Sequence, residues 1–102
     1  MRTLQFLVVE QSLTKSGDFS NIVKGTKGYL KCSFVFKGIS WIGVKAIAVF
    51  EANGKEFAVK IDANGAYLVP DEVTDFDHFK VCVHGFKNTY KIVTNKSLVE
   101  QR

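Results

Sequence analysis

The chain has 102 residues, of which 46% are hydrophobic and 24% charged, and a formal net charge of +4. This composition argues against a disordered or fibrous protein and predicts one globular domain over residues 1–102. No apolar run approaches the roughly 20 residues that span a bilayer as a helix, and the first residues lack a small-residue cleavage site, so we expect neither a membrane span nor a signal peptide.

Short segments rich in β-branched and aromatic residues follow one another along the chain, and most alternate apolar and polar side chains. This period of two predicts strands over residues 3–9, 28–36, 44–51, 56–62, 66–69, 78–83, 90–93 and 97–100. Asn53-Gly54 and Asn64-Gly65 are the strongest hairpin signals in the sequence. Gly85 is expected in a turn as well.

Residues 44–50 are apolar on both faces, which favours a central strand covered on both sides. Pro70 opens the one helical turn predicted, because proline is favoured at the first helical position. No segment carries an apolar stripe of helical period over three turns. Together these features predict an all-β fold, a small antiparallel β-sandwich of immunoglobulin-like architecture with about seven or eight strands.

The two cysteines lie on different sides of their strands. Cys32 shares its side with Phe34, on the expected core face, whereas Cys82 lies opposite the apolar side formed by Val81 and Val83. Two sulfur atoms placed in this way seldom meet the geometry of a disulfide. The sequence therefore predicts two free thiols and a reducing compartment.

One strand face carries His78, Lys80, Cys82 and His84. Cys82 and His84 would lie roughly 6.5–7 Å apart along the strand, close enough to bind one zinc ion. The spacing matches no common zinc pattern, so an ordinary half-exposed strand face is the simpler interpretation. A Cys–His pair without an orienting acid is also weak evidence for a nucleophile. We therefore expect no metal, no cofactor and no enzymatic activity.

Four acidic side chains stand close together at Asp71, Glu72, Asp75 and Asp77. Calcium prefers several oxygen ligands on one loop, but this segment lacks the glycine that a tight calcium loop needs. The alternative interpretation is a short turn with acids near its positive end.

The aromatic residues allow two interpretations. Phe34, Phe36 and Trp41 belong to a set that could stack on bases or sugars, but a domain of this size needs that many large side chains for its core. We predict a buried Trp41, whereas a carbohydrate-binding module would need this residue exposed.

The twelve Lys and two Arg stand singly along the chain. A nucleic-acid binder usually gathers its basic residues in one run or on one face. The sequence pattern therefore argues against nucleic-acid binding.

The order of features resembles the small N-terminal β-domains of baseplate, tail-fibre and head-fibre proteins in tailed phages of Gram-positive bacteria. The resemblance covers residues 28–100 and is carried by a succession of short motifs. In chain order these are Cys32-x-Phe34-x-Phe36, Trp41, Lys45-Ala46 with Ala48 and Phe50, Phe57-Ala58-Val59, Leu68-Val69-Pro70, Asp71-Glu72-Val73, the strand at 79–85 that ends in Gly85, and Val93-Thr94-Asn95.

This resemblance implies a structural or attachment domain of a virion that is assembled in the bacterial host cytoplasm. Its partners would be other virion proteins, and a homo-oligomer is left open. Docking would use an exposed sheet face or a sheet edge. The candidate contact residues are His78, Lys80, His84, Phe86 and Tyr90.

The main alternative is a small intracellular protein of a phage or its host that binds a macromolecule. Such a protein could inhibit a host defence or bind single-stranded nucleic acid. Lysines and free thiols would suit a cytoplasmic protein equally well.

Overall fold

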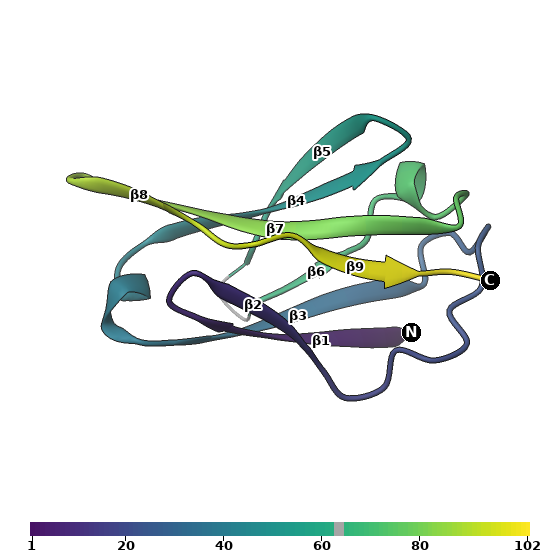
Figure 1. Cartoon of the computed structure of the whole chain (residues 1–102), viewed down its shortest axis with the longest axis horizontal. Helices are drawn as coiled ribbons and strands as arrows, with labels where there is room; N and C mark the ends of the chain where they lie inside the picture. The colour runs from purple at the N-terminus through teal and green to yellow at the C-terminus, as the bar shows by residue number, and fades with distance from the viewer. Residues whose placement is uncertain (63–64) are drawn as a thin grey trace.

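The computed structural model describes residues 1–62 and 65–102. These residues form nine strands, two 3₁₀ turns and no α-helix (Figure 1). The strands are β1 (Arg2–Val9), β2 (Ser12–Ser16), β3 (Leu30–Lys37), β4 (Lys45–Ala52), β5 (Lys55–Lys60), β6 (Ala66–Leu68), β7 (His78–Lys87), β8 (Tyr90–Val93) and β9 (Ser97–Glu100), and the turns are η1 (Ile39–Trp41) and η2 (Asp71–Val73). In this described part, no helix has the length and apolar character needed to cross a membrane.

The strands form two sheets that pack face to face (Figure 1). The first sheet has the order β2-β1-β3-β6, and the second has the order β5-β4-β7-β8, with β9 paired to β7 beyond the end of β8. β1 and β3 run parallel, whereas the other described pairs are antiparallel. The all-β sandwich is therefore confirmed, but the first sheet is mixed and not purely antiparallel as predicted.

The eight predicted strands are all present, and a further one, β2, was missed. β2 has the sequence S-L-T-K-S, in which Leu13 is the only apolar residue, so it shows little alternation. The turn before it contains Glu10 at φ 51°, a conformation for which the sequence offers no glycine as a signal. A two-residue turn built from polar residues other than Asn and Gly is therefore what hid the β1–β2 hairpin.

Gly85 lies inside β7, so its predicted place in a turn is wrong. A Cβ atom at this position would come within 2.5 Å of the Trp41 ring and 2.6 Å of Val44. The glycine lets the strand pass close to a large buried side chain, which is a recognised role of glycine within strands.

The Asn53-Gly54 signal is confirmed, because these residues join β4 to β5 with φ values of 52° and 75°. The second hairpin signal includes Asn64, which lies outside the described residues. The strands on either side of it, β5 and β6, pair in different sheets. The helical turn expected after Pro70 is confirmed as η2.

One core fills the space between the two sheets. Its buried side chains come from alternate strand positions, as a half-buried sheet requires, and include Leu4, Phe6, Val8, Leu13, Leu30, Cys32 and Phe34 from the first sheet and Ala48, Phe50, Phe79, Val81, Val83 and Val99 from the second. The rings of Phe6 and Phe34 stack at 5.4 Å across β1 and β3. Burying a large apolar side chain contributes about 1.5–3 kcal/mol, so this layer dominates the stability of the fold.

A polar clip joins the sheets along one side of the sandwich, where β2 meets the break between β8 and β9. Thr94 stays bonded to β7, since its N–H donates to Val83 O (3.0 Å) and its Oγ1 accepts from Val83 N–H (2.9 Å). Asn95 then reaches the other sheet, where its Oδ1 accepts from Leu13 N–H (2.7 Å) and its Nδ2 donates to Leu13 O (3.1 Å). We call this the closed side of the sandwich.

Candidate docking surface

The outer face of the second sheet is the surface on which the sequence placed most of its candidate contacts. The strand register puts Phe86 opposite Lys45, His84 opposite Ile47 and Cys82 opposite Val49. Paired residues of neighbouring strands point to the same side of a sheet. The outer face therefore consists of Lys45, Ile47, Val49 and Glu51 on β4, Glu56, Ala58 and Lys60 on β5, His78, Lys80, Cys82, His84 and Phe86 on β7, Lys91 and Val93 on β8, and Leu98 and Glu100 on β9.

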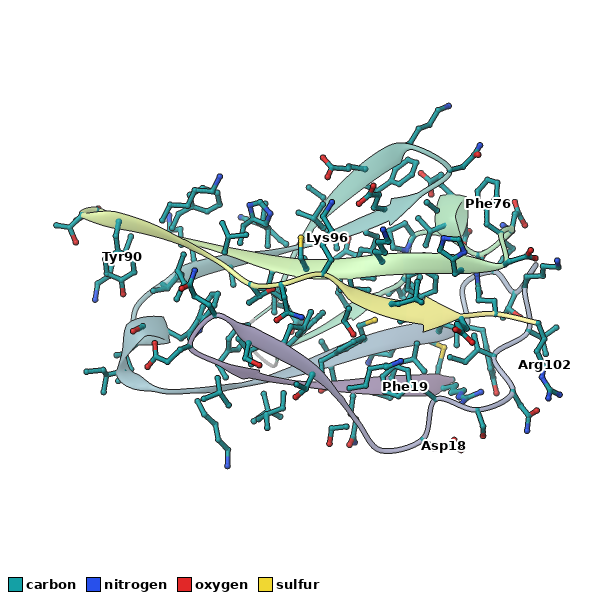
Figure 2. All side chains as sticks on the ribbon, viewed as in Figure 1. Asp18, Phe19, Phe76, Tyr90, Lys96 and Arg102 are labelled. Atoms are coloured by element: carbon teal, nitrogen blue, oxygen red, sulfur yellow. The ribbon has the colours of Figure 1, made fainter. Side chains whose placement is uncertain are left out.

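The register brings four of the five candidate contacts, His78, Lys80, His84 and Phe86, to this outer face. Tyr90 does not join them, because it pairs with Lys87 and points to the opposite side of the sheet. The Tyr90 hydroxyl donates a hydrogen bond to Ser40 O, which ties β8 to the turn η1. Figure 2 shows Tyr90 at the end of the β7–β8 hairpin, far from the centre of the face.

An apolar stripe of Ile47, Phe86 and Val93 crosses one half of the outer face, and Leu98 lies apart from it, opposite Lys80. Ile47 and Val93 are half-buried, while Phe86 (43% exposed) and Leu98 (40% exposed) are the exposed large apolar side chains among the described residues of the face. β4 is central in its sheet, as predicted, but no second layer of the described chain covers its outer side. Exposed aromatic and aliphatic side chains gathered on one face are typical of an interaction surface.

Cys82 is much less accessible than its predicted position suggested. Its strand side is as predicted, and both cysteines are free, but Cys82 is only 4% exposed. Lys96 (labelled in Figure 2) pairs with Glu51 at 2.7 Å, and both residues lie around Cys82 on the outer face. Burial raises the pKa of the Cys82 thiol, and the hydrogen bond from Lys96 lowers the pKa of Glu51. Lys96 lies in the segment between β8 and β9, so the residue spacing within β7 could not predict that it covers Cys82.

The His–Cys face shows no convergence of metal ligands. No group of three or more His, Cys, Asp or Glu side chains comes together within the described residues. Burial, followed by the charge of Lys91, lowers the pKa of His84, and burial keeps Cys82 in its thiol form. These pKa shifts are those expected of two side chains on a partly covered sheet face.

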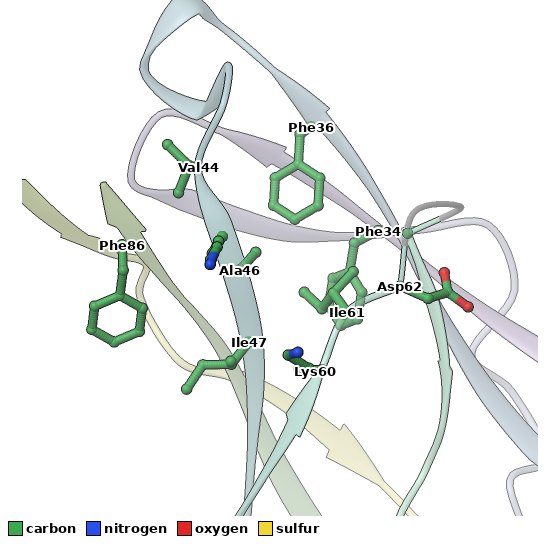
Figure 3. A pocket seen from close by; sticks show the side chains of 11 residues that line it. Phe34, Phe36, Val44, Ala46, Ile47, Lys60, Ile61, Asp62 and Phe86 are labelled. Atoms are coloured by element: carbon green, nitrogen blue, oxygen red, sulfur yellow. The ribbon is translucent and has the colours of Figure 1, made fainter. Parts of the chain in front are cut away.

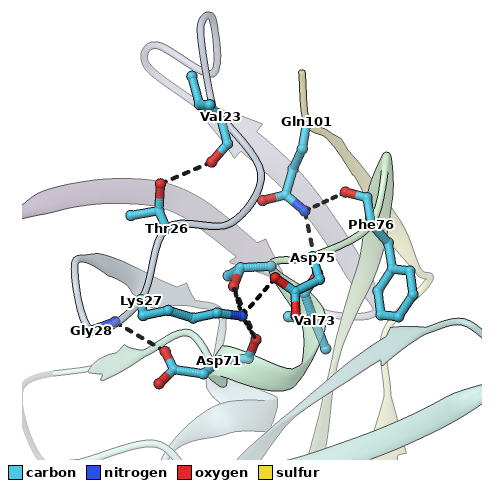
Figure 4. Close-up of polar contacts among 10 residues, drawn as sticks. Val23, Thr26, Lys27, Gly28, Asp71, Val73, Asp75, Phe76 and Gln101 are labelled. Atoms are coloured by element: carbon cyan, nitrogen blue, oxygen red, sulfur yellow. Dashed lines mark hydrogen bonds and ion pairs between the residues drawn. The ribbon is translucent and has the colours of Figure 1, made fainter.

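Lysines of the loop at residues 24–28 contact the acidic segment at residues 71–77 (Figure 4). Lys27 Nζ donates to Asp71 O (2.7 Å) and to Asp75 Oδ1 (2.9 Å), and Lys24 pairs with Asp77 at 2.6 Å. The Asp71 carboxylate accepts from Gly28 N–H (3.0 Å), so Asp71, Asp75 and Asp77 each have a different partner. Their described role is to hold this loop against η2.

Trp41 is buried, as predicted, with 7% of its surface exposed. Its Nε1 donates to Glu10 O (2.8 Å), and its ring centroid lies 4.9 Å from that of Phe36. A sugar-binding role would need an accessible ring face, so the carbohydrate interpretation loses the exposed residue on which it depended. Phe34 is core as well, whereas Tyr67 is partly exposed at the sheet edge.

A cleft of about 880 Å³ lies between the sheets on the side opposite the Asn95 clip (Figure 3). We call this the open side of the sandwich. Its apolar lining includes Phe34, Phe36, Val44, Ala46 and Ile61, and it adjoins the outer face through Lys45, Ile47, Lys60 and Phe86. Sequence reasoning missed the cleft, because it exists only where β5 and β6 diverge into different sheets.

Comparison with known proteins found no relative that bears on the role of this surface. No protein-family model, no curated protein and no solved structure matches the chain. The function is therefore argued from the surface itself and from the order of the sequence motifs.

Proposed function

We propose that this chain is a non-enzymatic docking domain of a tailed-phage virion, in a baseplate, tail fibre or head fibre. It binds a neighbouring virion protein through the outer face of the second sheet. The observation that carries the proposal is the exposure of Phe86 and Leu98 on a face that also holds His78, Lys80 and His84. The motif order of the sequence supports the virion assignment, and two free thiols agree with assembly in a reducing cytoplasm.

The proposal extends to an immunoglobulin-like core. In variable-type immunoglobulin domains one sheet pairs strand B with strand E, and the other has the order C′-C-F-G. The pair β3–β6 and the order β5-β4-β7-β8 correspond to these two arrangements. The β1–β2 hairpin, with its parallel pairing of β1 to β3, is an addition of this chain.

The partner surface should be acidic. Lys45, Lys60 and Lys91 border the apolar stripe, and opposite charges across an interface steer association and set its orientation. The three acids of the face, Glu51, Glu56 and Glu100, lie towards the other end of β4, β5 and β9 from Phe86. Added salt should therefore weaken docking, mainly because it screens the charges of the lysines near Phe86.

Mass spectrometry of purified virions tests the proposal. The phage that encodes the chain would carry either the unchanged gene, Phe86→Glu, or the control Val35→Glu, which places the same charge on the 52%-exposed Val35 of the other sheet. We expect the unchanged chain and the control in virions, and at least roughly tenfold less of Phe86→Glu. Absence of the unchanged chain, or equal incorporation of the two variants, would contradict the proposal.

Single-stranded nucleic acid is the second candidate partner. The structure brings three lysines that are separated in the sequence, Lys45, Lys60 and Lys91, to one part of the outer face near the exposed ring of Phe86. Basic and aromatic side chains on one surface are what such binding uses. Fluorescence anisotropy with labelled oligothymidine at about 50 and 200 mM salt distinguishes the candidates. Tight, salt-sensitive binding that Lys45→Glu abolishes would favour nucleic acid over a virion protein.

A further inference from the structure

We infer that β5, the last strand of the second sheet, pairs with β5 of a second copy of the chain. The two strands would run antiparallel about a two-fold axis at Ala58, so that the two second sheets join into one continuous sheet. The inference stands apart from the virion assignment, because it depends only on β5 and its surroundings. It concerns a surface different from the apolar stripe that contains Phe86.

The backbone of β5 directs hydrogen-bonding groups to the side away from β4, which we call the β5 edge. Ile61 N–H donates to Ala46 O (3.2 Å), which continues the register of the β4–β5 pair. Alternate residues of an antiparallel strand direct their N–H and C=O to the same side, so Glu56 and Ala58 direct theirs to the β5 edge. β5 stands at the end of the strand order, and Figure 1 shows it at the top of the view.

The chain that follows β5 leads away from this edge. Gly65 N–H donates to Asp62 O (2.9 Å), and Gly65 O accepts from Phe34 N–H of the other sheet. In a strand that rises about 3.3 Å per residue, Ala58 lies about 13 Å before Asp62. The β5 edge at Glu56 and Ala58 is therefore beyond the reach of the short connection to Gly65, and no other described strand pairs with it.

The charged side chains of β5 are complementary to themselves in one antiparallel register. Where Ala58 faces Ala58 of the second copy, Glu56 faces Lys60 and Lys60 faces Glu56. Both charged side chains are exposed on the outer face. Charges on an edge strand ordinarily keep sheets apart, but opposite charges directly across two strands attract. A shift of the register by two residues in either direction would lose both ion pairs.

The inner side of β5 is complementary in the same register. Phe57 faces Val59 of the second copy, and an aromatic side chain opposite a β-branched one is a favourable pair. Both are half-buried, and Val59 lines a groove with Tyr67 (38% exposed) and Leu68 (44% exposed). Phe57 of the second copy would lie beside this groove. Dimerisation would therefore bury apolar surface that one chain leaves exposed to water.

Sedimentation velocity of the intact chain over a range of concentrations tests the inference. We expect an equilibrium between one and two chains. Glu56→Lys and Lys60→Glu each bring like charges together across the axis and should weaken dimerisation at least roughly tenfold. A mixture of the two variants, or a chain with both substitutions, restores opposite charges and should restore the dimer. Glu100→Lys on β9 and Lys80→Glu on β7 make the same charge changes away from β5 and should leave the dimer unchanged.

Ala58→Pro tests the backbone part of the inference. Because Ala58 N–H points away from β4, proline removes the donor at the two-fold axis and no hydrogen bond within the chain. This variant should be monomeric with unchanged β-type circular dichroism; if it lost that signal, the charge variants alone would decide. Three results would overturn the inference: a chain that stays monomeric up to roughly 1 mM, a dimer that survives Glu56→Lys, or one that Phe86→Glu dissociates instead.

Discussion

The two sides of this sandwich meet the same physical demand in different ways. Backbone groups at the margin of a sheet need partners or exposure to water. On the closed side, Thr94 satisfies the backbone of β7 and Asn95 satisfies the backbone of Leu13 in the other sheet. On the open side, β6 ends after three residues, and Phe36 faces a cleft. The comparison shows that two adjacent side chains join the sheets along one margin, whereas along the other margin the described residues line a cleft.

Trp41 is the main apolar link between the sheets near the open side. It packs on Phe36 of the first sheet and against Gly85 of the second. Since its contacts are side-chain contacts, they join the sheets there without pairing the edge of β3. The open side is thus anchored at its end by an aromatic residue, whereas the closed side is joined by hydrogen bonds.

The largest expected effect comes from removing this anchor. Trp41→Ala deletes a buried ring and leaves a cavity, which typically costs about 3–5 kcal/mol of the free energy of unfolding. Urea unfolding followed by circular dichroism measures the loss. Ile42→Ala removes the exposed neighbouring side chain and should change the stability by no more than about 0.5 kcal/mol. Similar values for the two variants would show that Trp41 does not hold the open side together.

A smaller loss is expected on the closed side. Asn95→Ala removes two neutral hydrogen bonds to Leu13 at a partly exposed position, at about 1 kcal/mol each. The same urea experiment measures it. Asn88→Ala, in the turn between β7 and β8, is the matched control because no hydrogen bond from its side chain to the other sheet is described. An Asn95→Ala variant as stable as the control would remove the distinction between the two sides.

Much of this architecture was readable from the sequence, because half-buried strands impose a period of two. That period located eight strands, set Cys32 and Cys82 on opposite sides of their strands, and predicted the burial of Trp41. It also gathered His78 and His84 on one face, since both follow from the register of a single strand.

The remaining features depend on contacts between segments that are distant in the sequence. Lys96, which covers Cys82, lies in the segment between β8 and β9. Tyr90 pairs with Lys87, so its side chain points away from the outer face. The cleft arises because β5 and β6 pair with different sheets, although a hairpin signal lies between them. Local turn chemistry cannot decide which sheet a strand joins.

The two thiols lie in different places, Cys32 in the interior and Cys82 on the outer face. Burial raises the pKa of both cysteines, so neither reacts as a free thiol does at neutral pH. We expect Cys82 to react slowly with a disulfide reagent in the native protein and Cys32 only after unfolding. Cys82→Ser should abolish the native reaction. A native reaction that persists in this variant would mean that the inner face around Cys32 opens first.

The smallest expected effect is the pH dependence that arises from His84. Burial and Lys91 lower its pKa below the ordinary 6.5, so the unfolded chain binds the proton more readily than the folded chain. The free energy of unfolding should therefore fall as the pH drops through 6.5 towards the folded-state pKa. The His78→Gln variant leaves His84 as the only histidine, so its titration can be followed by nuclear magnetic resonance. A His84 pKa above 6.5 would contradict the partly covered position of this residue on the outer face.

Amide hydrogen exchange at Leu13 tests the account of the closed side most directly. The Leu13 N–H donates to the Asn95 side chain of the other sheet (2.7 Å), whereas the Val83 N–H donates to Thr94 Oγ1 (2.9 Å). We predict that the Leu13 amide is protected in the unchanged chain and exchanges much faster in Asn95→Ala, while the Val83 amide stays protected in both. Equal protection of the Leu13 amide in the two chains would contradict the account, because Asn95 would then not be the residue that joins the sheets on this side.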